Sequence, residues 1–255
     1  MSHRPRKRFG QHFLTAPEIV DQIVAAVSPQ NGDIIVEIGS GRAAITAPLA
    51  ALATTLHAIE LDRDLVAALR VRFAARDNVI IHEADALTFD FASLGDALRI
   101  VGNLPYNIST PLLFHLLQFS DHIVDAHFML QKEVVDRLCA EPGSRAYGRL
   151  TVMLGCRLQV LPLFEVPPEA FTPSPKVRSA VARLRPFPES MFDIRDKDRF
   201  AAIVKLAFSR RRKTLRNALQ GLVDVTEIEA AGLDAGCRPE QVPIAGWVAL
   251  ANGVD

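Results

Sequence analysis

The feature that most constrains the fold of this 255-residue chain is a regular alternation of strand-like and helix-like segments over its first 185 residues. Strands joined by helices run mostly parallel, because a parallel pair needs a long crossover connection. The sequence therefore predicts an α/β fold with a doubly wound, Rossmann-like sheet. The segments predicted as strands are 34–36, 55–59, 78–82, 98–101 and 127–130, with later β-prone stretches at 157–164 and 177–184.

The pattern changes at Pro186, after which no strong strand follows. Residues 196–255 are predicted to form several short helices, with breaks near Gly221, Gly232, Gly236 and Pro239. We therefore expect a catalytic domain over residues 1–186 and a small helical domain over residues 187–255.

Composition excludes several classes of protein. No run approaches the roughly 20 apolar residues of a membrane span. The basic N-terminus has no apolar stretch behind it, which argues against a secretory signal. Cys139, Cys156 and Cys237 lie far apart and form no CxxC motif, so neither a disulfide framework nor a cysteine metal site is expected. This cysteine usage fits a cytoplasmic protein.

The formal net charge of zero hides two clusters of basic residues. Such clusters usually contact polyanions, although a solvated tail explains the first equally simply. The second follows 200–208, a segment with apolar residues at helical spacing, so its cations are expected to be held in place. The first cluster contains Arg4, Arg6, Lys7 and Arg8, and the second contains Arg210, Arg211, Arg212, Lys213 and Arg216.

Polar or glycine residues follow four successive predicted strands, where an open α/β sheet binds its ligands. Glu60 lies 21 residues after Gly39, the spacing at which an acidic residue accepts hydrogen bonds from ribose hydroxyls. Asp85, with Ala86 beside it, is positioned to bind an adenine amine. A sheet-capping Glu37 and a turn-forming Asp85 are the structural alternatives. The residues at these strand ends are Glu37, Gly39, Gly41, Glu60, Asp85 and Asn103.

Two kinds of cofactor fit this arrangement. The spacing Gly39-x-Gly41-x-x-Ala44 satisfies the dinucleotide fingerprint, which favours a nicotinamide cofactor. S-adenosylmethionine (AdoMet) carries an ammonium and a sulfonium instead of a pyrophosphate. An acidic Glu37 suits those cations and repels a pyrophosphate, so the sequence favours AdoMet.

The run Asn103-Leu104-Pro105-Tyr106 follows the fourth predicted strand. The side-chain oxygen of Asn103 and a backbone carbonyl fixed by the proline can accept two hydrogen bonds from an exocyclic amine. Tyr106 offers a ring face for stacking on a base. The structural alternative is an ordinary proline turn with a buried tyrosine.

Taken in order, the motifs of this chain resemble those of the small-subunit ribosomal RNA adenine N6,N6-dimethyltransferases. The macrolide-resistance methyltransferases of ribosomal RNA share the pocket but resemble the chain less in Leu104 and in the basic run. His12 stands where the family often has Asn, and Ala44 replaces a third glycine. The motifs are residues 8–14, 36–41, 59–62, 84–86, 103–106, 130–134, 171–177 and 211–217.

The resemblance implies dimethylation at N6 of two adjacent adenosines in a hairpin loop near the 3′ end of small-subunit RNA. It implies AdoMet as the methyl donor and the assembling small subunit as partner. We also expect a monomer that acts without a metal, although the sequence leaves the oligomeric state open. It also assigns residues. Catalytic roles fall to Asn103, Leu104, Pro105, Tyr106 and Phe171. The Phe171 ring would stack on the base opposite Tyr106, and the structural alternative is a loop residue packed on the core. Cofactor binding falls to His12, Leu14, Glu37, Gly39, Gly41, Glu60, Leu61, Asp85, Ala86 and Asn103. RNA binding falls to Arg6, Lys7, Arg8, Arg210, Arg211, Arg212, Lys213 and Arg216.

Two rival interpretations remain at this point. A DNA adenine-N6 methyltransferase uses a similar turn with Asp in place of Asn, and Asn103 with the basic clusters favours RNA. A ribosome-assembly factor that retains AdoMet only structurally is the second rival, and the intact pocket argues against it.

Overall fold

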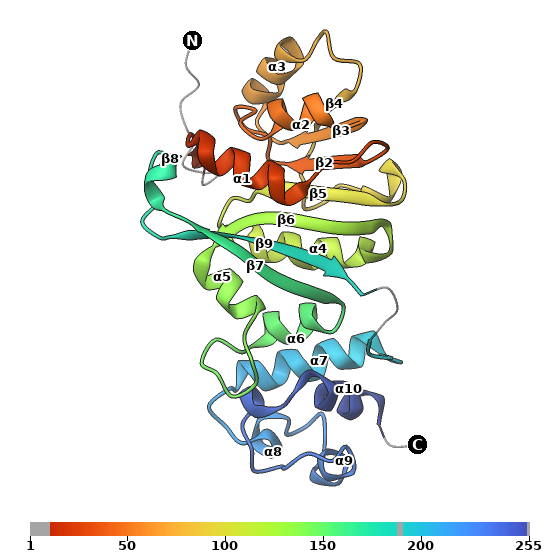
Figure 1. Ribbon diagram of the computed structural model, residues 1–255. Coiled ribbons are helices and arrows are strands. Elements are labelled where there is room, and N and C mark those ends of the chain that lie inside the picture. The colour runs from red at the N-terminus through yellow and green to blue at the C-terminus, as the bar shows by residue number, and fades with distance from the viewer. Residues whose placement is uncertain (1–10, 188–190, 254–255) are drawn as a thin grey trace. The chain divides into compact units, whose positions relative to one another are not determined.

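The computed structural model describes residues 11–187 and 191–253 (Figure 1). The chain divides into two compact units, which are considered separately. The first comprises the described residues up to Val135 together with Val160–Pro186. The second comprises Asp136–Gln159 and the described residues from Phe187 onwards.

The first unit is built on a seven-stranded sheet in the order β4-β3-β2-β5-β6-β9-β7. Strands β2 to β6 run parallel, and β9 runs antiparallel to β6. The α/β, Rossmann-like prediction is therefore confirmed, with an antiparallel strand added after β6. The strands are β2 (Ile34–Ile38), β3 (Thr55–Glu60), β4 (Val79–Glu83), β5 (Leu98–Asn103), β6 (Ile123–Gln131), β7 (Leu158–Val166) and β9 (Ser179–Pro186).

The strand order reverses between β2 and β5. In the register of the sheet, Glu37 lies beside Ala58 of β3 and Val101 of β5, and Glu60 lies beside Glu83 of β4. Parallel strands end at the same edge, so the carboxyl ends of β2, β3, β4 and β5 meet there. A crevice at such a reversal is the usual ligand site of an open α/β sheet.

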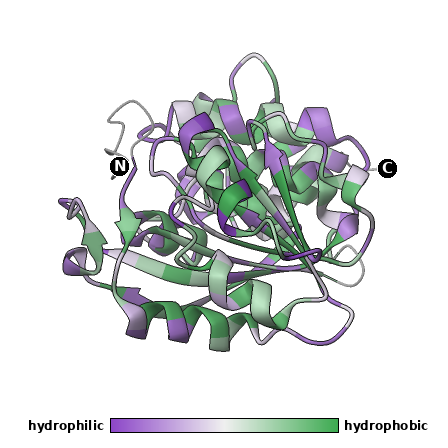
Figure 2. Ribbon diagram, turned by 90° about the horizontal axis from the view of Figure 1, so that it is seen from above, coloured by the Kyte–Doolittle hydropathy of each residue, from purple (hydrophilic) through white to green (hydrophobic). Residues whose placement is uncertain are grey.

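Apolar residues hold the helices of the first unit on this sheet, and Figure 2 shows the strands as predominantly hydrophobic ribbons. Pro17 begins the first helix, a position where its missing N–H costs nothing. Asp62 caps the helix that follows β3, because its carboxylate accepts from the Asp64 backbone N–H at 3.1 Å. The helices are α1 (Pro17–Val27), α2 (Thr46–Leu52), α3 (Arg63–Arg72), α4 (Ser109–Leu116) and α5 (Lys132–Leu138).

A separate two-stranded ribbon joins β1 (Phe13–Leu14) to β8 (Phe171–Thr172). Two-residue strands have no detectable alternation, so the sequence pattern did not predict them. The ribbon fixes the segment that precedes α1 beside the loop that precedes β9.

The second unit has its own apolar core, centred on the fully buried Trp247 and Phe200. Residues 136–159, which the sequence analysis placed in the first domain, belong to this core because Tyr147, Val152 and Cys156 pack in it. The helices of this unit are α6 (Arg149–Gly155), α7 (Lys197–Ser209), α8 (Leu215–Ala218), α9 (Val225–Ala230) and α10 (Ile244–Asn252).

A network of charges fastens the opposite edge of the sheet, at the start of the strands. Arg99 of β5 makes two hydrogen bonds, of 3.0 and 2.9 Å, to the carboxylate of Asp125, which is 1% exposed. It also donates to Asp33 at 2.7 Å and to the Val27 carbonyl at 2.7 Å. One guanidinium thus ties the end of α1 to the starts of β2, β5 and β6.

Replacing Arg99 by Met is expected to lower the free energy of unfolding by about 3 kcal/mol, because it leaves Asp125 buried without its main partner. Chemical denaturation measures this value. Arg63→Met is the matched control. The Arg63 side chain is 86% exposed and pairs with Glu83, and such a surface pair contributes roughly 1 kcal/mol or less. Equal losses in both variants would contradict the fastening role of Arg99.

Candidate active site

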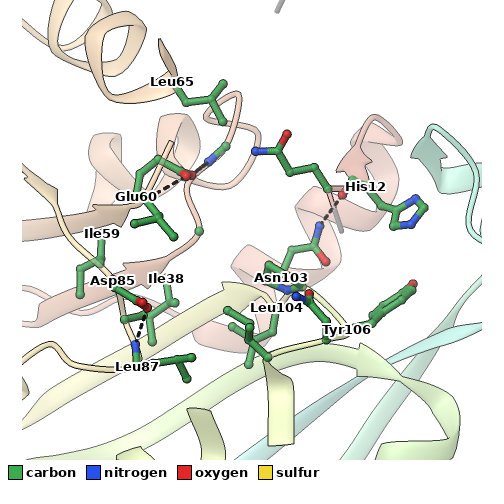
Figure 3. Close-up of a pocket in the computed structure, with 18 of the residues that line it drawn as sticks. His12, Ile38, Ile59, Glu60, Leu65, Asp85, Leu87, Asn103, Leu104 and Tyr106 are labelled. Carbon is green, nitrogen blue, oxygen red and sulfur yellow. Dashed lines mark hydrogen bonds between the residues drawn. The ribbon is translucent and has the colours of Figure 1, made fainter. Parts of the chain in front are cut away.

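A cleft lies at the carboxyl ends of β2, β3 and β5, where the parallel strands meet (Figure 3). It brings together most of the residues predicted for the cofactor and the base. Figure 3 shows Glu60 and Asp85 on one side of the cleft and Asn103, Leu104 and Tyr106 on the other. The predicted residues that line it are His12, Gly39, Gly41, Glu60, Leu61, Asp85, Ala86, Asn103, Leu104, Pro105 and Tyr106.

Glu60 holds the glycine turn at the end of β2. Its carboxylate accepts from the backbone N–H groups of Gly41 at 2.9 Å, Leu61 at 3.0 Å and Asp62 at 2.9 Å. Gly41 has φ +53°, and a Cβ there would lie 3.3 Å from the Phe13 ring, so any other residue would be strained at this position. The same carboxylate lines the cleft, where its remaining lone pairs can accept from ribose hydroxyls.

Burial raises the pKa of Glu60, and the three backbone hydrogen bonds oppose that shift. A carboxylate that already accepts from backbone N–H groups is fixed in orientation before a ligand arrives. This rigidity suits the recognition of two neighbouring hydroxyls.

Asp85 follows β4 and faces the cleft from the side of Glu60. Its Oδ1 accepts from the Leu87 N–H at 2.9 Å, which turns the loop and fixes the carboxylate. The second oxygen can accept a hydrogen bond from a group in the cleft. Apolar side chains that the sequence analysis did not identify complete the wall, because they look like ordinary core residues of strands and helices. They are Ile38, Ile59, Leu65, Leu87 and Ile108.

The side-chain amide of Asn103 is oriented by the segment before α1. Its Nδ2 donates to the backbone carbonyl of His12 at 2.9 Å, which leaves Oδ1 as the acceptor that the amide can offer a base. The backbone N–H of Leu104 donates to the Met129 carbonyl at 3.1 Å, which fixes this peptide. Gly102 allows the turn to approach β2, since a Cβ there would lie 2.6 Å from the Ile38 carbonyl oxygen.

Tyr106 is held on two sides. Its hydroxyl shares a hydrogen bond of 2.7 Å with Ser179 of β9, and burial raises the pKa of the phenol. The imidazole of His12 stacks on its ring, with centroids 5.6 Å apart and planes inclined by 26°. His12 Nδ1 donates to the Pro173 carbonyl at 2.7 Å, so this side chain joins the tyrosine to the loop after β8.

Leu14 and Glu37 line a small cavity that adjoins the cleft and shares Phe13, Gly39, Gly41 and Asn103 with it. Glu37 is 2% exposed, and its Oε2 has no hydrogen-bond partner among the described residues. Burial raises the pKa of Glu37 to about 7. A cation placed beside this carboxyl would favour its ionised form.

The structure does not bring Phe171 to the cleft. The ring is 3% exposed and belongs to the hydrophobic core of the first unit, since β8 pairs with β1 and places Phe171 beside Leu14. The geometry therefore gives no support to Phe171 as the second stacking face. Arg6, Lys7 and Arg8 lie outside the described residues.

The basic cluster of the second unit separates into two groups. Arg210 donates to the Ala218 carbonyl at 3.3 Å, and Arg211 donates to the Ser144 carbonyl at 3.3 Å and pairs with Glu240 at 3.5 Å. These two have structural partners. Three exposed side chains make no contact of this kind with any described residue, and they are Arg212, Lys213 and Arg216.

A fixed acidic acceptor at the end of β3, another after β4 and an amide at the end of β5 line the cleft of this Rossmann-like sheet. Together they define the class of AdoMet-dependent methyltransferases. The described helices include none that is long and apolar enough to span a bilayer. Within the described ranges, three or more His, Cys, Asp or Glu side chains never gather as a metal site would require.

Comparison with known proteins identifies the family. The family model described as "Ribosomal RNA adenine dimethylase" matches residues 2–254. The chain is 53% identical to "Ribosomal RNA small subunit methyltransferase A" of Chromobacterium violaceum, over 98% of this chain and 95% of that protein. It is 51% identical to the protein of the same description from Shewanella loihica, over 99% and 95%. This chain therefore belongs to the ribosomal RNA adenine dimethylase family and is an AdoMet-dependent methyltransferase of ribosomal RNA.

Solved structures agree with this assignment. A dimethyladenosine transferase from Plasmodium falciparum has a TM-score of 0.80 at 25% identity and covers 94% of this chain, with 96% of its own length matched. The 23S rRNA methyltransferase ErmE has a TM-score of 0.74 at 24% identity, over 94% of this chain and 98% of its own, and shows the shared fold.

Replacing Glu60 by Ala is expected to weaken AdoMet binding by about 10- to 100-fold, because the variant loses hydrogen bonds from the ligand to a charged group. Isothermal titration calorimetry measures the dissociation constant. The matched control is Glu83→Ala, because Glu83 is the register partner of Glu60 on β4 but lies outside the cleft. Wild-type affinity in Glu60→Ala would contradict a role in binding the ribose.

Proposed function

We propose that this chain transfers methyl groups from AdoMet to N6 of two adjacent adenosines in a hairpin loop near the 3′ end of small-subunit ribosomal RNA. The observation that carries the catalytic proposal is the hydrogen bond from Asn103 Nδ2 to the His12 carbonyl. It fixes the amide so that Oδ1 is available as an acceptor beside the Leu104 carbonyl.

The residues present fit AdoMet, which supplies an electrophilic methyl group on its sulfonium. Glu60 would hold the ribose, Asp85 and Ala86 the adenine, and Glu37 with Gly39 and Gly41 the methionine end. His12, Leu14 and Leu61 would complete the walls, which are mostly apolar on the adenine side.

The adenine amine is a weak nucleophile because its lone pair is delocalised into the ring. Hydrogen bonds from its two protons to Asn103 Oδ1 and the Leu104 carbonyl would favour a tetrahedral nitrogen and free that lone pair. Positive charge developing on N6 then faces two acceptors that are already fixed, which is electrostatic preorganisation. Holding N6 in line with the methyl group supplies further acceleration. The proton leaves to solvent after the transfer, so a strong base is not needed.

The base must leave its stack to reach this turn. Tyr106, held by Ser179, would then stack on it, with Pro105 shaping the wall. The second methyl transfer starts from a monomethylated amine with one remaining proton. The 103–106 turn must therefore bind the monomethylated adenine with only one of the two hydrogen bonds from N6.

The charge distribution of the second unit supports the RNA substrate. Arg212, Lys213 and Arg216 have no described partner to neutralise them, whereas Arg210 and Arg211 are partly engaged with the protein. We place the chain in the cytoplasm, acting as a monomer on the assembling small subunit, with the basic residues contacting its RNA. A duplex-DNA substrate is less favoured, because the family and its described relatives are named for ribosomal RNA.

Replacing Asn103 by Ala is expected to lower the methylation rate by about 100-fold or more, since a fixed donor or acceptor of this kind contributes roughly 3 kcal/mol to the transition state. AdoMet affinity should fall much less. Single-turnover transfer of labelled methyl groups to under-methylated small subunits measures the rate, and calorimetry measures the affinity. An unchanged rate would exclude Asn103 from the reaction.

The same reaction maps the target. Mass analysis of RNA fragments after the incubation should find two adjacent dimethylated adenosines in a 3′-terminal hairpin loop. Methylation of duplex DNA without methylation of the subunit would instead support the DNA alternative.

Replacing Arg212, Lys213 and Arg216 together by Ala is expected to weaken RNA binding and to lower the slope of log K against log salt by about 2 to 3, since each phosphate contact contributes nearly one. Filter binding at several salt concentrations measures the slope. Arg211→Ala is the comparison variant, and its main expected effect is on stability because it removes the pair with Glu240. An unchanged slope in the triple variant would show that these cations face away from RNA.

A further inference from the structure

Three buried polar atoms gather around the glycine turn without hydrogen-bond partners among the described residues. They are Glu37 Oε2, Ser40 Oγ and Thr46 Oγ1. Thr46 does not line the adjoining cavity, and its backbone also lowers the pKa of the carboxyl, so the observation rests on the unpaired Glu37 oxygen. A buried polar group left unpaired costs about 1–3 kcal/mol, and this oxygen at a cavity wall therefore marks a position for a polar ligand group. The Ser40 and Thr46 hydroxyls lower the pKa of the carboxyl, although neither reaches hydrogen-bond geometry with it.

Glu37 and Ser40 line the small cavity, which shares Gly39, Gly41 and Asn103 with the main cleft. A ligand that extends from the cleft can therefore place one polar group against the Glu37 carboxyl. Glu37 Oε2 is an acceptor when ionised, and an ionised carboxylate buried at 2% exposure needs a cationic partner. A primary ammonium group meets both conditions.

The charges around Glu37 come from two other elements. Glu60, at the end of β3, raises the pKa of Glu37 by repulsion. Arg42, from the turn after β2, lines the same cavity, with its guanidinium 4.3 Å above the Phe13 ring. Desolvation outweighs the groups that favour ionisation, and the pKa of Glu37 rises to about 7. Around neutral pH the free protein is therefore a mixture of protonated and ionised forms.

We propose that Glu37 is an ammonium-specific determinant of this site that gives up its proton when AdoMet binds. The proposal rests on AdoMet as the cofactor of the proposed function. The ligand ammonium keeps its three protons and pairs with the carboxylate, and the carboxylic proton leaves to solvent. Ligands that lack the ammonium group do not induce this ionisation.

The linkage sets the direction of the pH dependence. In the free protein the Glu37 carboxyl is mostly protonated below its pKa of about 7, and in the complex it is ionised. AdoMet binding below pH 7 therefore releases a proton. We expect release approaching one proton per AdoMet at pH 6, where the carboxyl is mostly protonated and the ligand amino group is already an ammonium. At pH 7.5 we expect little net release, because the amino group, with a pKa of about 8, takes up roughly as many protons as the carboxyl loses. AdoMet affinity should fall as the pH drops from 7.5 to 6, by about tenfold from its plateau.

Calorimetry in buffers of different ionisation enthalpy, at pH 6 and pH 7.5, counts the released protons for the full chain. AdoMet is compared with 5′-methylthioadenosine, which retains the adenosine part but has no ammonium group. Wild-type protein should release protons with AdoMet and not with methylthioadenosine. Glu37→Gln should release none with AdoMet and bind it about tenfold or more weakly at pH 7.5.

Proton release that persists in Glu37→Gln, or that also occurs with methylthioadenosine, would overturn the proposal, because the proton would then come from another group or from the ligand. His12→Asn tests whether the imidazole of the cleft is the source of the proton, and loss of the release at pH 6 in this variant would overturn the proposal as well. A wild-type protein that does not bind AdoMet at all would refute the proposed function instead.

Infrared difference spectroscopy of the wild type provides a measurement that does not depend on the folding of a variant. Adding AdoMet at pH 6 should remove the band of one protonated carboxyl group. A band that remains unchanged on saturation with AdoMet would show that Glu37 stays neutral in the complex, and the proposal would fail.

Discussion

The site depends on one constraint, the parallel register of β2, β3, β4 and β5. Because these strands end at one edge, Glu37, Glu60, Asp85 and Asn103 converge although up to 66 residues separate them in sequence. Gly102 makes the closest approach possible, since any side chain there would meet the Ile38 carbonyl. The charge network around Arg99 secures the other edge of the same strands.

Two carboxyl groups in this crevice differ in a way that suits two tasks. Glu60 accepts three backbone hydrogen bonds and is organised before the ligand arrives. Glu37 is buried with an unpaired oxygen, so a cation that enters beside it would favour its ionised form. In the proposals made above, Glu60 recognises hydroxyls through its rigidity, and Glu37 recognises charge through a change of its own protonation. Both carboxyl groups are buried. They differ in the number of backbone N–H groups that donate to them.

The catalytic turn is supported from segments remote in sequence. The carbonyl of His12 orients Asn103, its imidazole covers a face of Tyr106, and Ser179 anchors the tyrosine hydroxyl. The short ribbon between β1 and β8 holds the first of these supports beside the loop after β8. The same pairing carries Phe171 into the core, so a residue predicted to face the base lies beside Leu14 instead.

The sequence by itself determined the sheet, its helical crossovers and the acidic and amide residues at its carboxyl edge, because strand periodicity and residue chemistry are local properties. It also identified the family, through motifs that lie in order along the chain. Only the tertiary structure decided which way the Asn103 amide points, that Phe171 is buried, that residues 136–159 join the second core, and which arginines are already engaged. These features depend on contacts between distant segments, and a local pattern carries no information about a partner that lies a hundred residues away.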